Sequence, residues 1–413
     1  MTNIFFAHSG GVTSVLNHIA SSVIRSAQMS SHIDRIYVGK NGILGALNNE
    51  LYDVTDFDEQ QLISLCHTPA SAFGSCRYKL KCPISQANEF NSIMNTFKQH
   101  NITRFIYNGG NDSQDTTLKL HTFASQKDYP LYCIGIPKTI DNDLPMVDCS
   151  PGYASAAKYI ATSALECSLD VLSMCESSTK LFIMEVMGRH AGWLAAASAM
   201  AHHSSGIGPH LILLPEVTYE ADKVIQATKE MVKQHGYCVI VASEGIRDQT
   251  GQLVSQQQSY DAFGHAQLGG VAPIIAKHIH QATQFKYHYC VADYLQRSAG
   301  HLTSAVDHDH ANALGAAAVE AVNQHQSGLM VGIKRTQQSP YQWRVDTFQL
   351  DDIANKEYAL PKHFIREDQL GVTQAFIDYL SPLIQGETVP RFKSGLPDYF
   401  QPLNIKQTRE EHA

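Results

Sequence analysis

The sequence is short of the patterns that mark common zinc modules and membrane proteins. None of its nine cysteines forms a Cys-x-x-Cys pair, and none of its 21 histidines belongs to a His-Glu-x-x-His motif. No apolar run approaches the roughly 18 residues that a membrane span needs. The first residues pass from a short apolar run into glycines, unlike a signal peptide. We therefore expect reduced cysteines and a cytoplasmic protein without membrane contact.

The chain also lacks an excess of basic residues. Its 31 Lys and Arg against 39 Asp and Glu give a formal net charge of −8. General nucleic-acid binders usually carry a basic balance or stripe, so nucleic acid is not an expected partner. An anionic substrate would have to be held by a local basic pocket, because overall attraction is absent.

Two histidines, His308 and His310, flank Asp309. These two histidines are either metal ligands or polar residues at the entrance of a helix. We expect the helix entrance, because the spacing of a known zinc site is missing.

Short apolar runs alternate with longer amphipathic segments, which is typical of βα units. The predicted strands are Ile4 to His8, Arg35 to Val38, Arg104 to Tyr107, Leu131 to Ile136, Lys180 to Val186, His210 to Leu214, Tyr237 to Ala242 and Leu329 to Ile333. The predicted helices include Ser14 to Met29, Tyr153 to Cys175, Trp193 to His202, Glu220 to Gln234 and His308 to His325.

This pattern predicts an α/β fold with two Rossmann-like lobes, whose mainly parallel sheets are flanked by helices. We expect one lobe from residues 1–150 plus about 300–345, a second from 151–299, and an irregular C-terminal extension over 346–413. The active site is expected in the cleft between the lobes.

The most informative stretch runs from Gly135 to Asp143. It continues an apolar segment and then places Lys138, Thr139 and Asp141 where the strand should open into a loop. A carboxylate beside a lysine at the end of a buried parallel strand suits proton abstraction from a hydroxyl next to a bound phosphate. The stretch therefore indicates phosphoryl transfer onto a sugar hydroxyl.

Two glycine turns follow other predicted strands. Residues 9–14 could bring backbone amides and a helix N-terminus to a phosphate, although tight turns also use glycine for steric reasons. Residues 109–113 add oxygens of Asn111 and Asp112, which could hold Mg²⁺ directly or through water. The alternative is an ordinary turn in which Ser113 caps the next helix. Neither turn matches Walker A or the GxGxxG dinucleotide fingerprint.

Further candidate residues lie near the ends of other predicted strands, where open α/β sheets build their sites. Arg77 and Arg189 could bind phosphate oxygens, and Arg77 could equally be a solvated loop residue. Glu244 could accept hydrogen bonds from sugar hydroxyls or cap a helix. Arg297, together with Lys286, could bind a terminal phosphate.

In an ordered set of motifs, the chain resembles the phosphofructokinase superfamily over roughly residues 3–335. The motifs are Gly10-Gly11, Gly74-Ser75-Cys76-Arg77, Gly109-Gly110-Asn111-Asp112-Ser113, Pro137 to Asp143, Met187-Gly188-Arg189, Ser243-Glu244-Gly245 and Tyr294 to Arg297. The chain length and residues 263–270 resemble the bacterial pyrophosphate-dependent branch of that superfamily.

The resemblance implies roles for individual residues. Asp141 is implied as the base that deprotonates the 1-hydroxyl of fructose 6-phosphate. Further catalytic roles are implied for Lys138, Asp112 and Arg189. The implied diphosphate ligands are Gly11, Arg77 and Lys138, and the implied Mg²⁺ ligand is Asn111. The implied substrate-binding residues are Thr139, Ile140, Asp141, Lys180, Met187, Gly188, Arg189, Glu244, Tyr294, Leu295, Gln296 and Arg297.

Relatives in this superfamily usually form dimers or tetramers in which a neighbour completes the sugar-phosphate pocket. The resemblance therefore implies a homodimer or homotetramer, with Lys180 as a cation supplied across subunits. Three departures are visible. Asn111 replaces a common Asp, and Tyr294 replaces a frequent His. The cross-subunit arginine expected upstream of Tyr294 has no clean match, and Lys286 is a candidate for its place.

Two positions favour pyrophosphate over ATP as the donor. ATP-using members have glycine at the place of Asp112, whose carboxylate would fill the volume of a nucleotide α-phosphate and repel its charge. They also have glycine at the place of Lys138, whose ammonium can neutralise charge on the departing phosphate.

We therefore expect a Mg²⁺-dependent, reversible phosphate transfer between pyrophosphate and fructose 6-phosphate. Reversibility is expected because pyrophosphate and the product ester are closer in energy than ATP and that ester. The alternatives are an ATP-dependent 6-phosphofructokinase and a non-catalytic, sugar-phosphate-binding regulatory subunit. A dinucleotide oxidoreductase is disfavoured by the missing GxGxxG fingerprint.

Overall fold

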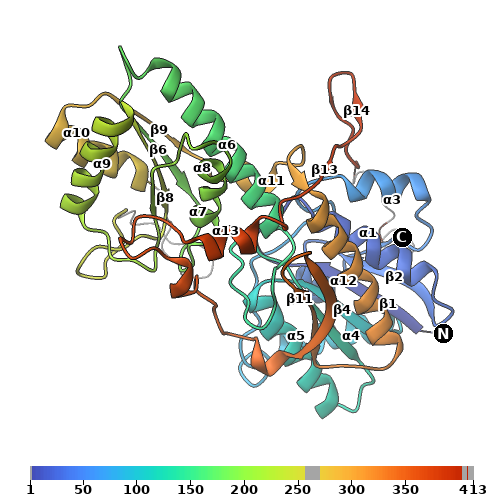
Figure 1. The fold of residues 1–413 in the computed structure, drawn as a ribbon. Coiled ribbons are helices and arrows are strands. Elements are labelled where there is room, and N and C mark those ends of the chain that lie inside the picture. Colours follow the sequence, from blue (N-terminus) through green and yellow to red (C-terminus); the bar gives the residue numbers. More distant parts are fainter. Residues whose placement is uncertain (1, 256–269, 402–406, 408–413) are drawn as a thin grey trace.

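The computed structural model describes residues 2–255, 270–401 and 407 and arranges them in two lobes (Figure 1). Most of residues 263–270, which carry one part of the family resemblance, lie outside the described residues. Among the helices described, none is both long and apolar enough to cross a membrane.

The first lobe is built on a seven-stranded sheet in the order β12-β11-β5-β4-β1-β2-β3. Its strands are β1 (Thr2–His8), β2 (Ile33–Gly39), β3 (Leu51–Asp53), β4 (Ile102–Gly109), β5 (Tyr132–Pro137), β11 (Leu329–Gln337) and β12 (Gln342–Gln349). Neighbouring strands are parallel except at the two edges, where β3 and β12 run antiparallel to their partners.

Both faces of this sheet are buried, which explains the near-continuous apolar run in β1. Ile4 and Phe6 face a core shared with α1 and α12, whereas Phe5 and Ala7 face a second core shared with α4 and α5. The helices of this lobe are α1 (Leu16–Gln28), α2 (Ile43–Asn48), α3 (Glu59–Cys66), α4 (Ala87–Gln99), α5 (Asn111–Gln126) and α12 (Ala305–Asn323).

The second lobe has a fully parallel four-stranded sheet in the order β7-β8-β6-β9. Its strands are β6 (Leu181–Val186), β7 (Leu211–Leu213), β8 (Cys238–Ser243) and β9 (Tyr287–Val291). Its helices are α6 (Tyr153–Met174), α7 (Trp193–Ala197), α8 (Ala199–Ser205), α9 (Ala221–His235), α10 (Val271–Thr283) and α11 (Leu295–Ser298). One face of the sheet packs on α6 and α7, and the other packs on α9 and α10.

The prediction of one helix from Trp193 to His202 is wrong in detail, since the segment divides at Ser198. The Ser198 hydroxyl donates a hydrogen bond of 2.6 Å to the carbonyl oxygen of Ala195. Such back-bonding competes with the regular helical ladder and interrupts the helix there.

A buried carboxylate joins α6 to α12. Asp307, in the first turn of α12, accepts hydrogen bonds of 3.0 Å from the amide of Gly152 and 2.6 Å from the hydroxyl of Ser155. Both donors lie at the start of α6, so one side chain satisfies the open N-terminus of that helix. His308 and His310 also lie near the start of α12, as predicted, and both are buried.

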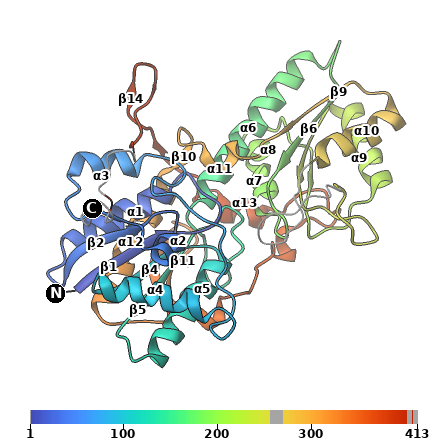
Figure 2. The ribbon, with the colours of Figure 1, turned by 180° about the vertical axis from the view of Figure 1, so that it is seen from behind.

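After β12 the chain is mostly irregular and returns across both lobes. Its elements are η1 (Leu350–Asp352), η2 (Lys362–Phe364), α13 (Gln374–Leu380), β13 (Glu387–Thr388), β14 (Phe392–Lys393) and β15 (Leu396–Pro397). Helix α13 lies between the two lobes in both views (Figures 1 and 2). Its Tyr379 ring packs against Trp193 of the second lobe and under the guanidinium of Arg335 of the first.

Candidate active site

The loops that carry the predicted chemistry follow three adjacent strands of the first sheet. Strands β5, β4 and β1 are neighbours and parallel, so their carboxyl ends share one edge. Residues 9–13, 110–113 and 138–143 leave the sheet there. The predicted juxtaposition of the two glycine turns with the Lys138 loop is therefore present.

Lys138 lies at the centre of this edge. Its side chain is 3% exposed, and its ammonium donates a hydrogen bond to the carbonyl oxygen of Gly11. Burial lowers the pKa of Lys138 to about 7, and the charge of Arg297 acts in the same direction. Asp141 and Asp143 oppose the shift. The site thus holds a cation that solvent does not stabilise. An incoming anion would stabilise it.

Two guanidinium groups gather around Lys138. Arg297 Nη1 lies 3.2 Å from where a side-chain β-carbon on residue 11 would be, so glycine there leaves room for the guanidinium to approach the turn. Arg77 lies close enough to depress the pKa of both Lys138 and Arg297. Buried Arg297 Nε has no hydrogen-bond partner among the described residues. Three cations and an unused donor around a glycine turn are the kind of arrangement that binds an anion in proteins.

Asp141 is set in a tightly constrained loop. Its amide donates to the Thr139 hydroxyl at 3.1 Å, and the next residue, Asn142, has a left-handed φ of 52°. The side-chain Oδ1 of Asn142 accepts a 3.0 Å hydrogen bond from the backbone amide of Ser150. Ile140 is buried in the core of the second lobe. The loop is therefore anchored on both sides of Asp141.

The electrostatic environment of Asp141 favours its neutral form. Burial raises the pKa of this carboxyl, and Asp143 and Glu244 raise it further. Lys138 and Arg189 act in the opposite direction. The influence of Arg189 and Glu244 also shows that second-lobe residues approach Asp141.

The second lobe contributes the ends of β6 and β8. Gly188, just after β6, has φ 137°, and its carbonyl accepts a 2.5 Å bond from the hydroxyl of Ser243. Glu244 accepts a 3.4 Å bond from the Gly188 amide, and burial raises its pKa to about 7. A β-carbon on Gly245 would lie 2.1 Å from the carbonyl oxygen of Arg189. Because Gly188 and Gly245 have no side chains, the turns that follow β6 and β8 can pack closely against each other.

Met187 is tied to the loop that follows β9. Its amide donates a 3.1 Å bond to Oε1 of Gln296, which is buried. The exposed ring of Tyr294 stacks on the Arg297 guanidinium at 3.9 Å. Leu295 is 64% exposed. The predicted sugar-binding residues of this loop thus point in different directions, and only Gln296 is part of the interior.

The turn after β4 contains the residue predicted to hold Mg²⁺. Asn111 Nδ2 donates a 2.6 Å bond to the carbonyl of Lys356, whereas its buried Oδ1 has no partner in the part of the chain that the structure describes. An unpaired amide oxygen beside a phosphate site is a suitable ligand for Mg²⁺. Asp112, next in the chain, forms a 2.6 Å ion pair with Lys79.

Lys180 lies apart from the other predicted residues. It precedes β6, whereas Met187, Gly188 and Arg189 follow that strand. At about 3.3 Å per residue, the two ends are roughly 25 Å apart. The Lys180 ammonium donates to the carbonyl of Cys175, and its amide donates to the carbonyl of Lys286 at 3.0 Å. Lys286 therefore lies at this far end, away from Arg297.

Sequence reasoning missed the part that the C-terminal extension takes in the site. The backbone amide of Tyr358 donates a hydrogen bond of 2.8 Å to the carbonyl oxygen of Asp143. Glu357 forms an ion pair with His190 at 2.8 Å. Glu216, a carboxylate of the second lobe, accepts 2.8 Å bonds from the amides of Gly192 and Leu360. These partners lie far apart along the chain, and no local motif marks them.

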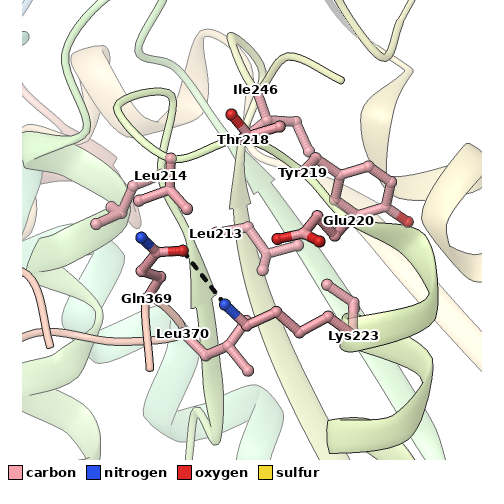
Figure 3. Close-up of a pocket in the computed structure, with 11 residues that line it drawn as sticks. Leu213, Leu214, Thr218, Tyr219, Glu220, Lys223, Ile246, Gln369 and Leu370 are labelled. Atoms are coloured by element: carbon pink, nitrogen blue, oxygen red, sulfur yellow. Dashed lines mark hydrogen bonds between the residues drawn. The ribbon is translucent and has the colours of Figure 1, made fainter. Parts of the chain in front are cut away.

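A separate pocket opens in the second lobe, between the end of β7, the start of α9 and the returning extension (Figure 3). Lys223 Nζ donates a 3.3 Å bond there to the side-chain oxygen of Gln369. The lining is largely apolar and includes Leu213, Tyr219 and Leu370. It contains none of the predicted site residues, so it is not the candidate active site.

Known proteins resemble this chain over nearly its full length. A phosphofructokinase family model matches residues 3–322. The pyrophosphate–fructose 6-phosphate 1-phosphotransferase of Halomonas elongata is 50% identical over 396 residues, covering 96% of this chain and 94% of that protein. A protein of the same name from Methylococcus capsulatus is 46% identical over 404 residues, covering 98% and 96%. The crystal structure of a pyrophosphate-dependent phosphofructokinase from Marinobacter aquaeolei, 46% identical, aligns with a TM-score of 0.89 over 98% of this chain and 96% of that one.

Proposed function

The chain belongs to the phosphofructokinase family, and we propose that it transfers phosphate reversibly between pyrophosphate and the 1-hydroxyl of fructose 6-phosphate. The products of the forward reaction are fructose 1,6-bisphosphate and orthophosphate. The observation that carries the choice of donor is the buried ammonium of Lys138 on the Gly11 carbonyl, next to two guanidinium groups. A compact, highly charged inorganic donor matches so dense a cluster of cations.

In this proposal Gly11, Arg77 and Lys138 bind pyrophosphate, and Arg297 lies against the same glycine turn. Lys138 neutralises the charge that develops on the departing phosphate. Its depressed pKa supports the role, because a poorly solvated ammonium interacts strongly with an arriving anion.

Asp112 is proposed to restrict the donor to one without a nucleotide. Its position two residues after Gly110 and its 2.6 Å ion pair with Lys79 support this role, because they place a bulky charged pair next to the glycine turn. Since the pair is neutral as a whole, exclusion would come mainly from its bulk. Charge repulsion, the other half of the sequence argument, is weakened by Lys79.

Asp141 is proposed as the base that takes the proton of the 1-hydroxyl. A carboxylate whose pKa is raised toward neutrality is better matched to a sugar hydroxyl than a fully solvated one. Arg189 lies close enough to stabilise the charge of Asp141 or of the transferred phosphate. Thr139, Met187, Gly188 and Glu244 would surround the sugar.

Mg²⁺ is proposed to bind at Asn111, whose Oδ1 is buried and unpaired within the described residues. When bound, the ion would neutralise phosphate charge in the transition state. Asn111 itself is held in orientation by its bond to the Lys356 carbonyl.

Self-association is proposed because Lys180 cannot reach the site of its own subunit. Apolar side chains are exposed on α6 near this end of the second lobe (Leu169, Leu172 and Met174) and along the edge strand β9 (Tyr289 and Val291). A homodimer or homotetramer would cover them and could bring Lys180 to a neighbour's sugar phosphate. We place this assembly in the cytoplasm.

A donor screen tests the proposal. Purified protein is assayed with fructose 6-phosphate and Mg²⁺ while pyrophosphate, ATP and other nucleotides are offered separately. We expect turnover with pyrophosphate and next to none with ATP. Faster turnover with ATP would identify an ATP-dependent kinase. Sugar binding without turnover on any donor would identify a regulatory subunit.

A further inference from the structure

Three helices of the first lobe bring together a histidine, a cysteine and a second histidine. His18 lies on α1, Cys66 is the last residue of α3, and His308 lies in the first turns of α12. One ligand atom from each lies within 4.8 Å of the others. We propose that these three residues form a binding site for a divalent metal ion of the zinc class, distinct from the Mg²⁺ site at Asn111.

The spacing of the ligand atoms is close to that of a tetrahedral zinc centre. His18 Nδ1 lies 2.8 Å from Cys66 Sγ, and the rings of His18 and His308 are 4.5 Å apart between centroids. Around a tetrahedral zinc ion, sulfur and nitrogen ligands lie about 3.6 Å apart and nitrogen pairs about 3.3 Å apart. Binding of one ion would therefore require the distance from His18 Nδ1 to Cys66 Sγ to lengthen by about 0.8 Å.

The chemistry of the donors selects the class of metal. Two imidazole nitrogens and one thiolate favour Zn²⁺ and its softer neighbours over Mg²⁺, which prefers oxygen. Burial lowers the pKa of both imidazoles, which leaves their lone pairs available. The Cys66 thiol would lose its proton to solvent on binding. Arg25, which also influences His18 and Cys66, is engaged with Glu59 at 2.7 Å.

A second shell supports His308 as a ligand. Thr388 Oγ1 lies 3.1 Å from His308 Nε2. If that nitrogen carries the proton and donates to Thr388, Nδ1 is left free to bind a metal, which is how ligating histidines are usually oriented. His67 lies nearby, with its ring 6.2 Å from that of His308. The fourth coordination position is open to His67 or to water.

The position of the cluster indicates a structural role. A metal ion there would link α1, α3 and α12, and through Thr388 it would also fix β13 of the C-terminal extension. None of the ligands belongs to the proposed phosphate or sugar site. A bound ion would therefore stabilise the first lobe without entering the reaction, and its loss would leave the basal turnover intact.

Metal binding to the full-length protein is the direct test. Protein stripped with a chelator is titrated with Zn²⁺ alone, and separately with Co²⁺ to observe a thiolate-to-cobalt absorption band. We expect one Zn²⁺ per chain, a rise in melting temperature and the band. Cys66→Ser should abolish the band and weaken Zn²⁺ binding by about 100-fold or more, since a first-shell ligand should matter at least as much as second-shell partners, whose loss costs 10–100-fold.

Matched controls separate the cluster from scattered sites. Cys82→Ser removes an exposed cysteine, and His301→Gln removes an exposed histidine just before α12. Both should bind Zn²⁺ as the wild type does. In the wild type, Zn²⁺ should also slow alkylation of Cys66 but not of Cys82. This measurement does not require any variant to fold. Absence of a zinc-dependent change, or unaltered affinity in Cys66→Ser, would overturn the site.

Discussion

The side-chain amide of Asn142 donates a hydrogen bond of 3.0 Å to the hydroxyl of Tyr379, 237 residues further along the chain. That hydroxyl in turn donates a 2.6 Å bond to the carbonyl of Asp148. Tyr379 therefore links the residue after Asp141 to Asp148, further along the same loop. This positioning role could not be read from either segment alone.

Tyr379→Phe should lower kcat by at least about tenfold, since the two hydrogen bonds of the hydroxyl, each worth roughly 1–1.5 kcal/mol, are lost at the loop that presents the base. KM for the sugar should change less than kcat, and the pH profile of kcat should shift. Steady-state kinetics across pH checks this. Tyr237→Phe is the control, because Tyr237 also donates to a backbone carbonyl, of Ile207, but lies away from the loop. Equal kinetic effects in both variants would remove Tyr379 from positioning.

Asp141→Asn should lower kcat by about 10²–10⁴-fold, because the amide cannot accept the hydroxyl proton. Fructose 6-phosphate should still bind within a few-fold of the wild-type affinity. Calorimetry of sugar binding, together with turnover measurements, tests both parts. Wild-type turnover in this variant would exclude Asp141 as the base.

Lys138→Met should stabilise the protein while it abolishes turnover. The folded-state pKa of Lys138 is about 7, below its ordinary value. Between pH 7 and about 10.4 the unfolded chain binds the extra proton, so wild-type stability rises with pH there. The advantage of the variant is thus largest below pH 7 and shrinks above it. Urea unfolding at several pH values measures this difference in stability. As a control, Lys229→Met on the exposed face of α9 should give no such pH-dependent gain in stability.

Asp112→Gly combined with Lys138→Gly should permit turnover with ATP. The first change removes the bulk in front of the glycine turn and releases Lys79 to meet a nucleotide phosphate. Glycine in α5 also costs about 1 kcal/mol of helix stability, so Thr122→Gly in the same helix is the control for that cost. Competition between ATP and pyrophosphate supplies the measurement. A double variant that still excludes ATP would locate donor selection elsewhere.

Subunit mixing can decide whether Lys180 acts across an interface. Lys180→Ala and Asp141→Asn should each give a nearly inactive homo-oligomer. If Lys180 serves the neighbouring site, a purified hetero-dimer of the two variants has one intact site and should recover about half of wild-type activity. A hetero-dimer of Asp141→Asn with Arg189→Ala should recover none, since both residues serve one site. No rescue in the first pair would place Lys180 outside the reaction.

The sequence predicted the two-lobe α/β fold because the strands are buried on both faces. Ile4 and Phe6 serve one core and Phe5 and Ala7 the other, so β1 appears as an apolar run that periodicity detects easily. Strand ends then locate the glycine turns and the Asp141 loop, because parallel strands end at one edge. These inferences depend on residues that are close along the chain.

Contacts between distant segments could not be predicted in this way. The ion pair of Asp112 with Lys79 and the bond from Asn111 to the Lys356 carbonyl join segments with no shared pattern. The cluster of His18, Cys66 and His308 is of the same kind. His308 was expected at a helix entrance, which it occupies, but nothing in the sequence indicates which helices pack against it.

The C-terminal extension has a consequence for synthesis of the protein. Lys356, Tyr358 and Tyr379 follow all strands of the two sheets along the chain, yet they bond to the turn after β4 and to the Asp141 loop. A nascent chain can build both sheets before these residues emerge. Until they emerge, the turn that carries Asn111 and the loop that carries Asp141 lack these hydrogen bonds, so the sheets can form before the candidate site is complete.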